Sequence, residues 1–408
     1  MFVYVLATLD TKGLESQFVC HHLNDLGIAT KLVDTGCIGE PLVKADIPRE
    51  DVYQAANTTL AAMQQQGDRA TAVMQAAAGA MNITSAAYAR VELAGVLSLG
   101  GSAGTTIGTE SMRALPLGVP KLMVSTLASG QTRPYVEDKD IFMLNSVVDI
   151  AGINRISRRV LGEAAAAMAG MVKFHREEIA EDKPLIAASM FGVTTPCVQH
   201  ARKLLEAAGY EVLVFHATGN GGKAMESLIR EGLIAGVLDI TTTELADELV
   251  GGILSAGPSR LTAASEMSVP QVVSVGALDM VNFGPFETVP EKFRHRKFHK
   301  HNATVTLMRT TPEENTKLGE EIVRKLAAAR GSVTLLLPRM GVSAIDKAGQ
   351  PFDDVFARAA LLNGTQNVEA TNVEIQFLDL HINDEAFAEL AAQKLLAMMH
   401  SVKDAPKS

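Results

Sequence analysis

The chain has 408 residues, of which 47% are hydrophobic and 20% charged, and this composition excludes a disordered protein. The 37 lysine and arginine residues are outnumbered by 46 aspartate and glutamate residues, and the net charge of −9 argues against nucleic acid as a partner. The length predicts two or three domains. Aromatic residues make up only 5%, with no tryptophan, so the core must be aliphatic, which favours helices packed on parallel strands.

The cysteines and the apolar segments indicate a cytoplasmic protein. Cys20, Cys37 and Cys197 form no Cys-x-x-Cys pair, and their odd number is a poor basis for a disulfide framework, so a reducing compartment fits better. Residues 1–9 are apolar but carry no basic leader or cleavage signature, which predicts a buried first strand rather than a secretion signal. The most apolar helix candidate, residues 164–172, is too short to span a membrane.

Two segments of the chain, 3–36 and 185–219, follow the same order of elements. Each has an apolar run, a polar turn, a stretch of helical periodicity ended by glycine, and a second β-rich run. Each therefore predicts a right-handed βαβ unit. The parallel continues downstream, where short strands are predicted to begin at Gly95 and Gly236.

This repetition predicts the fold class α/β, with two similar doubly wound, Rossmann-like parallel-sheet subdomains and a ligand cleft between them. We expect the subdomains to cover residues 1–180 and 181–408. The boundary is predicted near 177–183, where a helix-rich stretch gives way to charged residues and Pro184. One continuous large sheet is the alternative.

In the first half, loops rich in glycine, serine and threonine follow three predicted strands. Backbone N–H groups without a neighbouring Cβ can approach an anion, and the start of the next helix adds favourable partial charge. The alternative is that these are ordinary tight turns between strand and helix. The candidate phosphate-binding residues are Asp10, Thr11, Lys12, Gly100, Gly101, Ser102, Gly104, Thr105, Ser125, Thr126, Ser129 and Gly130.

The second half has a comparable loop at residues 218–224, with substrate-binding candidates Gly219, Gly221, Gly222 and Lys223. The pattern is formally G-x-G-x-x-A, and Asp239 follows about twenty residues on, as a dinucleotide-binding motif requires. However, the loop follows the second predicted strand of its subdomain rather than the first. A phosphate or carboxylate cradle is therefore the simpler interpretation.

Four further polar residues of the second half follow predicted strands. His216, Asp279 and Asp346 are candidates for acid–base catalysis, and Asn282 is a candidate for substrate binding. For each of them a structural role, as a helix cap or in a turn, is the alternative.

Residues 292–301 read KFRHRKFHKH, with five basic residues, three histidines and no acid. In a chain of net negative charge, this segment is predicted to face an anion, and Arg294, His299 and His301 are added to the substrate-binding candidates. No metal site is expected there. A solvated basic loop and a contact with phosphate or RNA are the alternatives.

Nine stretches spread along the chain resemble the ATP-binding domain of the Tm family of tomato mosaic virus resistance proteins and its uncharacterised bacterial and fungal relatives. Runs such as MFGVTTPCV, GVLDITTTE and VGALDMVNFGP are too long to match by chance. The matching stretches are 100–105, 125–131, 147–154, 190–198, 213–226, 236–244, 274–285, 307–311 and 341–346.

The resemblance implies two α/β subdomains, binding of ATP with Mg²⁺, and self-association as a homodimer or higher homo-oligomer. Lys12 would then supply charge to the phosphates, with Asp10 or a water holding Mg²⁺. The plant protein carries a further barrel domain resembling phosphoenolpyruvate hydrolases, which implies a separate barrel protein as a partner here.

Three functions stay open from the sequence. The first is an ATP-binding protein, with an ATP-dependent enzyme acting on a small anionic metabolite as its catalytic form. The second is a nucleotide-responsive binding module without catalysis. The third is a dinucleotide-dependent oxidoreductase that uses residues 219–239.

Overall fold

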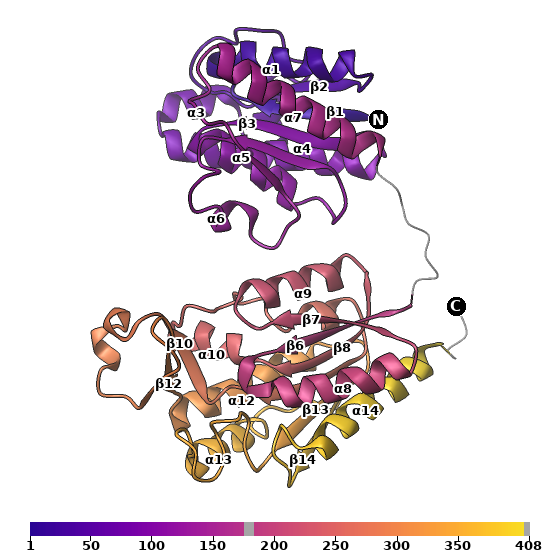
Figure 1. Cartoon of the computed structure of the whole chain (residues 1–408), viewed down its shortest axis with the longest axis vertical. Helices are drawn as coiled ribbons and strands as arrows, with labels where there is room; N and C mark the ends of the chain where they lie inside the picture. The colour runs from indigo at the N-terminus through magenta and orange to yellow at the C-terminus, as the bar shows by residue number, and fades with distance from the viewer. Residues whose placement is uncertain (175–182, 404–408) are drawn as a thin grey trace. The chain divides into compact units, whose positions relative to one another are not determined.

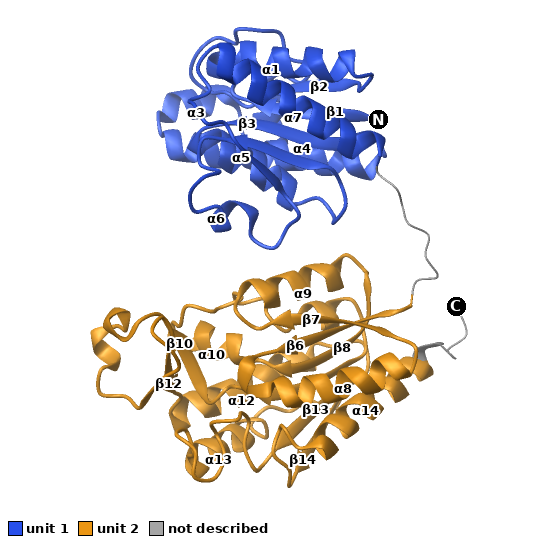
Figure 2. Cartoon of the chain, in the orientation of Figure 1, with its two compact units in different colours: residues 1–179 blue, residues 180–408 orange. Residues whose placement is uncertain are grey.

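A computed structural model describes residues 1–174 and 183–403 of the chain (Figure 1). The chain divides into two compact units, residues 1–179 and 180–408 (Figure 2). The boundary expected at 177–183 lies almost wholly outside the described residues. Each unit is built on a parallel sheet with helices on its faces, which confirms the predicted α/β class with Rossmann-like sheets.

The sheet of unit 1 has the strand order β2-β1-β3-β4-β5, and all of its strands are parallel. Strand β1 lies between β2 and β3, so the connection from β1 to β2 and the connection from β2 to β3 run in opposite directions along the sheet. This reversal creates a switch point beyond the carboxyl end of β1. The strands are β1 (Phe2–Ala7), β2 (Thr30–Asp34), β3 (Leu93–Gly100), β4 (Lys121–Ser125) and β5 (Phe142–Asn145).

Helices cover both faces of this sheet because alternate residues of β1 are apolar on each side. Val3 and Val5 pack in one buried cluster with residues of α1 and α7, whereas Tyr4 and Leu6 pack in another with residues of α4 and α5. The helices are α1 (Leu9–Asp25), α2 (Arg49–Ala55), α3 (Leu60–Gln66), α4 (Arg69–Ala89), α5 (Ser102–Arg113), α6 (Arg133–Val136) and α7 (Arg155–Lys173).

The sheet of unit 2 has the order β14-β13-β9-β8-β6-β7 and is also parallel. Its part β7-β6-β8-β9 repeats the order β2-β1-β3-β4 of unit 1, as the duplicated sequence pattern predicts. The strands are β6 (Leu185–Met190), β7 (Glu211–His216), β8 (Ile234–Thr241), β9 (Gln271–Gly276), β13 (Val333–Pro338) and β14 (Val373–Leu378).

Unit 2 also has a small antiparallel sheet of order β10-β12-β11, which the sequence patterns do not predict. Its strands are β10 (Met280–Phe283), β11 (Phe298–Lys300) and β12 (Thr306–Arg309). The basic segment 292–301 leads into it.

The helices of unit 2 pack against its large sheet, and Figure 1 shows α8 beside α14 over one face. They are α8 (Thr195–Ala207), α9 (Asn220–Arg230), α10 (Thr243–Val250), α11 (Ala263–Glu266), α12 (Pro312–Ala327), α13 (Val355–Gly364) and α14 (Glu385–Lys403). Among the described helices of the whole chain, none combines the length and the apolar character that a membrane crossing requires.

Helix α4 approaches α2 closely at Gly79, and this contact yields a test of the fold. A Cβ at this position would overlap the carbonyl oxygen of Val52. We expect Gly79→Ala to lower the free energy of unfolding by about 1–3 kcal/mol. Gly170→Ala in α7 is the matched control, because no atom lies within 4 Å of its added Cβ and alanine favours a helix by roughly 0.5–1 kcal/mol. Denaturant unfolding measures both, and an unchanged midpoint for Gly79→Ala would contradict the packing of α2 on α4.

Candidate functional site

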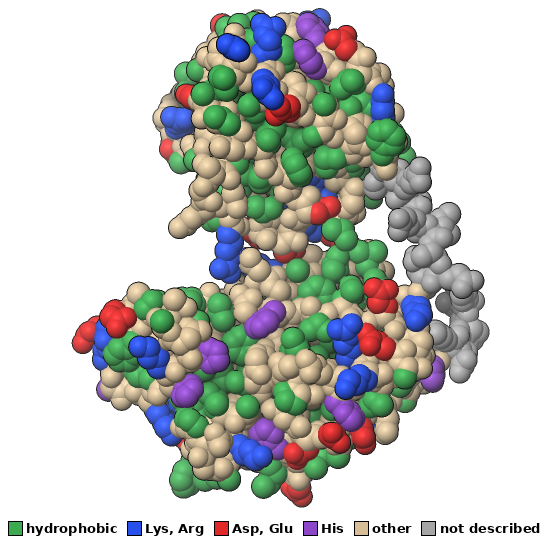
Figure 3. Space-filling model, in the orientation of Figure 1, with side chains coloured by type: hydrophobic (Ala, Val, Ile, Leu, Met, Phe, Trp, Pro, Cys, Tyr) green, Lys and Arg blue, Asp and Glu red, His purple; other side chains and the backbone are tan. Residues whose placement is uncertain are grey.

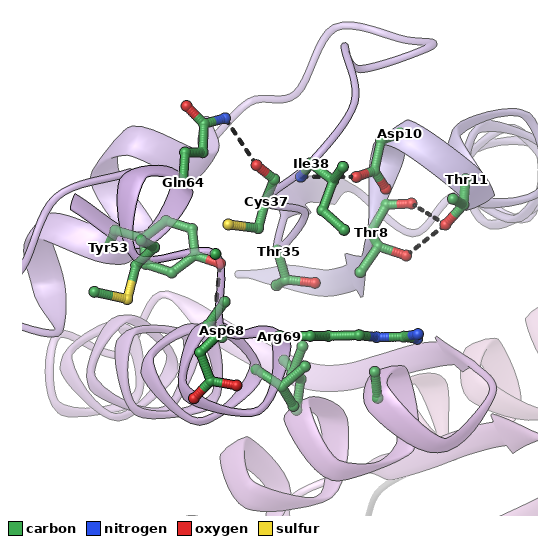
Figure 4. Close-up of a pocket in the computed structure, with 16 residues that line it drawn as sticks. Thr8, Asp10, Thr11, Thr35, Cys37, Ile38, Tyr53, Gln64, Asp68 and Arg69 are labelled. Carbon is green, nitrogen blue, oxygen red and sulfur yellow. Dashed lines mark hydrogen bonds between the residues drawn. The ribbon is translucent and has the colours of Figure 1, made fainter. Parts of the chain in front are cut away.

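A pocket of about 620 Å³ lies at the carboxyl edge of the sheet in unit 1 (Figure 4). Its walls are the start of α1, the loop that follows β2, the segment that joins α3 to α4, and the start of α5. Thr8 follows β1, and Ala103 belongs to the helix that follows β3, so the pocket occupies the switch point between these strands. Open α/β sheets bind their ligands at such a point.

A buried ion pair shapes the wall of this pocket. One oxygen of the Asp34 carboxylate accepts hydrogen bonds from the N–H groups of Leu9 (3.0 Å) and Gly36 (2.9 Å), and the other accepts from Nε of Arg49 (2.7 Å). Nη1 of Arg49 donates in turn to the carbonyl of Gly39 (2.5 Å). The pair therefore ties β2, α1 and α2 to the loop at residues 35–39.

Asp10 and Gln64 hold the same loop from two other sides. Oδ2 of Asp10 accepts from the N–H groups of Ile38 (3.4 Å) and Gly39 (3.3 Å). Nε2 of Gln64 donates to the carbonyl of Cys37 (2.8 Å). The loop that lines the pocket is thus fixed by side chains from α1, α2 and α3.

Arg69 is the cationic side chain of the pocket lining, and sequence reasoning missed it. It stands at the first position of α4, directly after Asp68, whose carboxylate accepts from the N–H groups of Ala70 and Thr71. Figure 4 shows the Arg69 side chain extended across the pocket towards the side where Thr8 lies. The guanidinium makes no hydrogen bond or ion pair with any described residue, so it is available to an anion.

Of the predicted phosphate-binding residues, Asp10 and Thr11 line the pocket. Lys12 lies in α1 at a turn of non-helical backbone (φ −125°, ψ 17°) and is not part of the lining. The hydroxyl of Thr11 contacts that of Thr8 at 2.9 Å.

The predicted loop after β3 divides into packing residues and residues at a helix start. A Cβ at Gly100 would lie 2.8 Å from Cα of Gly104, so this glycine pair lets α5 approach the strand. Thr105 is buried and donates to the carbonyl of Gly101 (2.7 Å). Gly101 and Ser102 form the start of α5, which no described side chain caps and which has no acid in its first turn.

The predicted loop after β4 lies beside that helix start and outside the pocket lining. Oγ of Ser125 accepts from the N–H of Leu127 (2.9 Å) and contacts the Thr105 hydroxyl (2.7 Å). A Cβ at Gly101 would lie 3.7 Å from Oγ1 of Thr126. The last two candidates of this set, Ser129 and Gly130, lie further along the same loop.

In unit 2, the predicted anion cradle binds a carboxylate of the chain itself. Oε1 of Glu244 accepts from the N–H groups of Gly219 (2.7 Å) and Gly222 (3.1 Å). Helix α9 already begins at Asn220, so Gly222 and its neighbours Gly221 and Lys223 stand in a helical turn. Glycine at 221 is required by close packing, because a Cβ would overlap the carbonyl oxygen of His216.

Arg260 is fully buried and forms ion pairs with the Glu244 carboxylate and with two other carboxylates. Its guanidinium donates to Glu244 (2.7 Å), to both oxygens of Asp239 (2.5 and 2.7 Å) and to Glu226 (3.4 Å). Burial raises the pKa of Glu244, and the positive charge of Arg260 opposes that rise. Asp239, the residue that a dinucleotide motif would use to bind ribose, is therefore enclosed in a salt bridge.

The switch point of unit 2 is closed by its own side chains. The hydroxyls of Thr194, at the start of α8, and Thr241, at the end of β8, are in contact at 2.8 Å. Oγ of Ser189, in β6, donates to Asp239, in β8 (2.6 Å). At this position of unit 2 the polar side chains that follow the strands are therefore hydrogen-bonded to one another.

The two predicted catalytic acids, Asp279 and Asp346, have no exposed surface and lie in one polar cluster. Oγ of Ser343 donates to Asp279 (2.8 Å), and its burial and the negative charge of Asp346 raise the pKa of Asp279 to about 7. Asp346 accepts from Arg309 (3.2 Å) and Arg358 (2.8 Å). Both acids are enclosed by other residues of unit 2, and neither belongs to the lining of the pocket in unit 1.

Asn282 is also buried, and its partner is Asp247. The backbone N–H of Asn282 donates to Oδ1 of Asp247 (3.0 Å), and its Nδ2 donates to Oδ2 (2.7 Å). Burial raises the pKa of Asp247 to about 7. A substrate cannot reach Asn282 without displacing this pair.

The remaining candidates lie at the surface of unit 2. The His216 ring is exposed and packs edge-on against Phe191, with the ring centroids 5.3 Å apart. Arg294 stacks on Phe286 at 5.0 Å, and His299 lies 6.2 Å from another ring. His301 is exposed. On the face drawn in Figure 3, positive and negative side chains are interspersed over this unit.

The fold and the pocket together define a protein of two Rossmann-like units with a ligand-sized pocket in the first. The chain belongs to the uncharacterised protein family UPF0261, whose N-terminal domain matches residues 1–177 and whose C-terminal domain matches residues 183–399. A UPF0261 protein of Clostridium tetani is 50% identical over 398 residues, which cover 97% of this chain and 98% of the relative.

Two tomato (Solanum lycopersicum) proteins confirm the predicted resemblance to the Tm family. The ToMV resistance protein Tm-1 is 49% identical over 74% of this chain, and the ToMV susceptible protein tm-1 is 41% identical over 97%. The matches cover 41% and 55% of the tomato chains, so this chain corresponds to about half of each.

Among solved structures, a putative UDP-N-acetylglucosamine 2-epimerase of Listeria monocytogenes aligns over 99% of this chain and 97% of its own, with 12% identity and a TM-score of 0.22.

In the described part of the chain, no three histidine, cysteine or acidic side chains lie close enough together to hold a metal ion.

The buried Asp247 makes the stability of unit 2 depend on pH. Its pKa is raised from 3.8 to about 7, so the folded chain holds this proton more tightly than the unfolded chain does. Stability from this group is therefore complete below its ordinary pKa and is lost as the pH rises through about 7. We expect the free energy of unfolding to fall between about pH 4 and pH 7, and Asp247→Asn to make this fall shallower.

Urea unfolding at several pH values measures the effect, with Asp379→Asn, at an exposed side chain of the same unit, as the control. Asp279 titrates in the same range, so a smaller slope should remain in Asp247→Asn. Equal slopes for the wild type and Asp247→Asn would contradict the assignment.

Proposed function

We propose that unit 1 binds a nucleotide, ATP, in the pocket at its switch point, with the phosphates held by Arg69. The observation that carries this proposal is an unpaired guanidinium extended across a pocket of ligand size. Guanidinium groups bind phosphate through two parallel hydrogen bonds. A volume of about 620 Å³ lies within the usual range for small-molecule sites.

The charges at the two helix starts orient the nucleotide. Asp10 stands in the first turn of α1, and its carboxylate repels a phosphate there. The start of α5 at Gly101 and Ser102 has no acid and no side-chain cap, so its N–H groups favour an anion. We therefore propose that the phosphates lie on the α5 side of the pocket, next to a part of the predicted 100–105 loop.

Apolar side chains supply the site for the base. Tyr53, Met63 and Val73 line the pocket on the side of α2, α3 and α4. An aromatic ring and aliphatic groups suit the faces of a purine, which are apolar and flat. Mg²⁺ would enter with the triphosphate, whose oxygens supply many of the ligands of this ion in nucleotide sites.

Binding, rather than catalysis, is the part of the expected function that the geometry favours. Asp279 and Asp346 are enclosed, and the cradle at Gly219 is filled by Glu244. The same enclosure of Asp239 argues against an oxidoreductase that binds a dinucleotide at residues 219–239. A nucleotide-responsive binding module is therefore the form of the function that we propose.

We expect Arg69→Ala to weaken ATP binding by about tenfold or more, because a charge-assisted, two-pronged contact to phosphate is lost. The fold should be retained, because the Arg69 guanidinium makes no hydrogen bond or ion pair with any described residue. Calorimetric titration with ATP measures the affinity, and a thermal melt with ATP or NAD measures the stabilisation.

Arg159→Ala is the control, since this arginine of α7 is 82% exposed and pairs only with Glu163 among the described residues. Unchanged affinity in Arg69→Ala, or stabilisation by NAD without stabilisation by ATP, would contradict the proposed site.

A further inference from the structure

Two residues that line the pocket in unit 1 have a buried polar atom without a partner. Oδ1 of Asp10 and Oγ1 of Thr35 both line this region, are shielded from solvent, and make no hydrogen bond. Nη2 of Arg49, a residue outside the pocket lining, is a third buried atom without a partner. It lies 2.7 Å from the place that a Cβ would take on Gly36, and the Asp10 carboxyl lies 3.1 Å from the same place. Unpaired buried atoms are costly, so their clustering indicates a ligand group that pairs with them.

The chemistry of these atoms restricts the missing group. An ionised carboxylate oxygen only accepts, so the group must donate a hydrogen bond to Asp10. It cannot be a phosphate, because two anions would then be in contact. The Thr35 hydroxyl both donates and accepts. A neutral hydroxyl can donate to Asp10 and accept from Thr35, so a group of this kind suits both residues.

The position of these two residues identifies the part of a nucleotide that reaches them. In Figure 4, Thr35 lies between Asp10 on one side and Arg69 on the other. The sugar of a nucleotide lies between its phosphates and its base. A sugar hydroxyl is therefore next to the phosphate group that Arg69 holds.

We propose that Asp10 and Thr35 form a hydroxyl-binding subsite that selects ribonucleotides over nucleotides whose sugar lacks hydroxyls. This inference rests on the proposed binding of ATP in the same pocket and names the sugar that the pocket accepts. Asp34, which ends β2, does not take this role, because Arg49 and the N–H groups of Leu9 and Gly36 already occupy its oxygens.

The test titrates the wild-type chain with ATP, 2′-deoxy-ATP, 3′-deoxy-ATP and 2′,3′-dideoxy-ATP by calorimetry. We expect dideoxy-ATP to bind at least about tenfold more weakly than ATP, because it would leave the buried atoms of Asp10 and Thr35 unpaired. Equal affinity for ATP and dideoxy-ATP would overturn the subsite while the nucleotide site stands, and would leave Asp10 to a magnesium ion. No binding of any of the four would overturn both proposals.

A variant separates recognition by Thr35 from a general effect on the fold. Thr35→Val keeps the shape of the side chain and removes a hydroxyl that has no partner, so the melting temperature of the free protein should not fall. We expect the difference in affinity between ATP and dideoxy-ATP to shrink at least threefold in this variant. Thr106→Val is the control, because the Thr106 hydroxyl donates to the carbonyl of Ser102 outside the pocket lining. An undiminished difference in Thr35→Val would overturn the role of Thr35.

Discussion

The buried ion pair between Asp34 and Arg49 is the constraint on which the proposed site depends. One carboxylate joins the end of β2 to the start of α1 and, through the guanidinium, to Gly39 in the loop beyond β2. A buried pair of this kind adds little net stability in itself, but loss of one partner leaves an uncompensated charge. Its role here is positional, because it fixes the loop that carries Thr35 at the wall of the pocket.

The two units share a strand order but differ at the carboxyl edge of the sheet. In unit 1 the crevice between the first and third strands is open and lined by an unpaired cation. In unit 2 the hydroxyls of Thr194 and Thr241 are hydrogen-bonded to each other at the corresponding strand ends, and the start of α9 binds Glu244. An internal carboxylate thus occupies the kind of position that a ligand anion takes at a helix start. Duplication of a sheet therefore does not imply duplication of a binding site.

The α/β class and the repeated βαβ unit follow from patterns in the sequence, because hydrophobic periodicity and glycine breaks are local signals. The binding residues depend on contacts that are distant along the chain. Arg69 lies in the long connection between β2 and β3, where it looks like an ordinary residue after the helix cap Asp68. Likewise, the sequence around Gly219 resembles a phosphate-binding loop, but in the structure its N–H group donates to Glu244, 25 residues further along the chain. The sequence pattern selected Asp10 and Thr11, which line the pocket, but it does not show which charged groups there lack a partner.

We propose that the nucleotide binds at the switch point of unit 1 and not at the start of α9 in unit 2. A crystal structure of the chain grown with ATP and Mg²⁺ tests it most directly. We expect electron density for a nucleotide in the pocket of unit 1, with phosphate oxygens on the Arg69 guanidinium and the Glu244 carboxylate still on the N–H groups of Gly219 and Gly222. A nucleotide bound at the start of α9, with Glu244 displaced, would contradict the account.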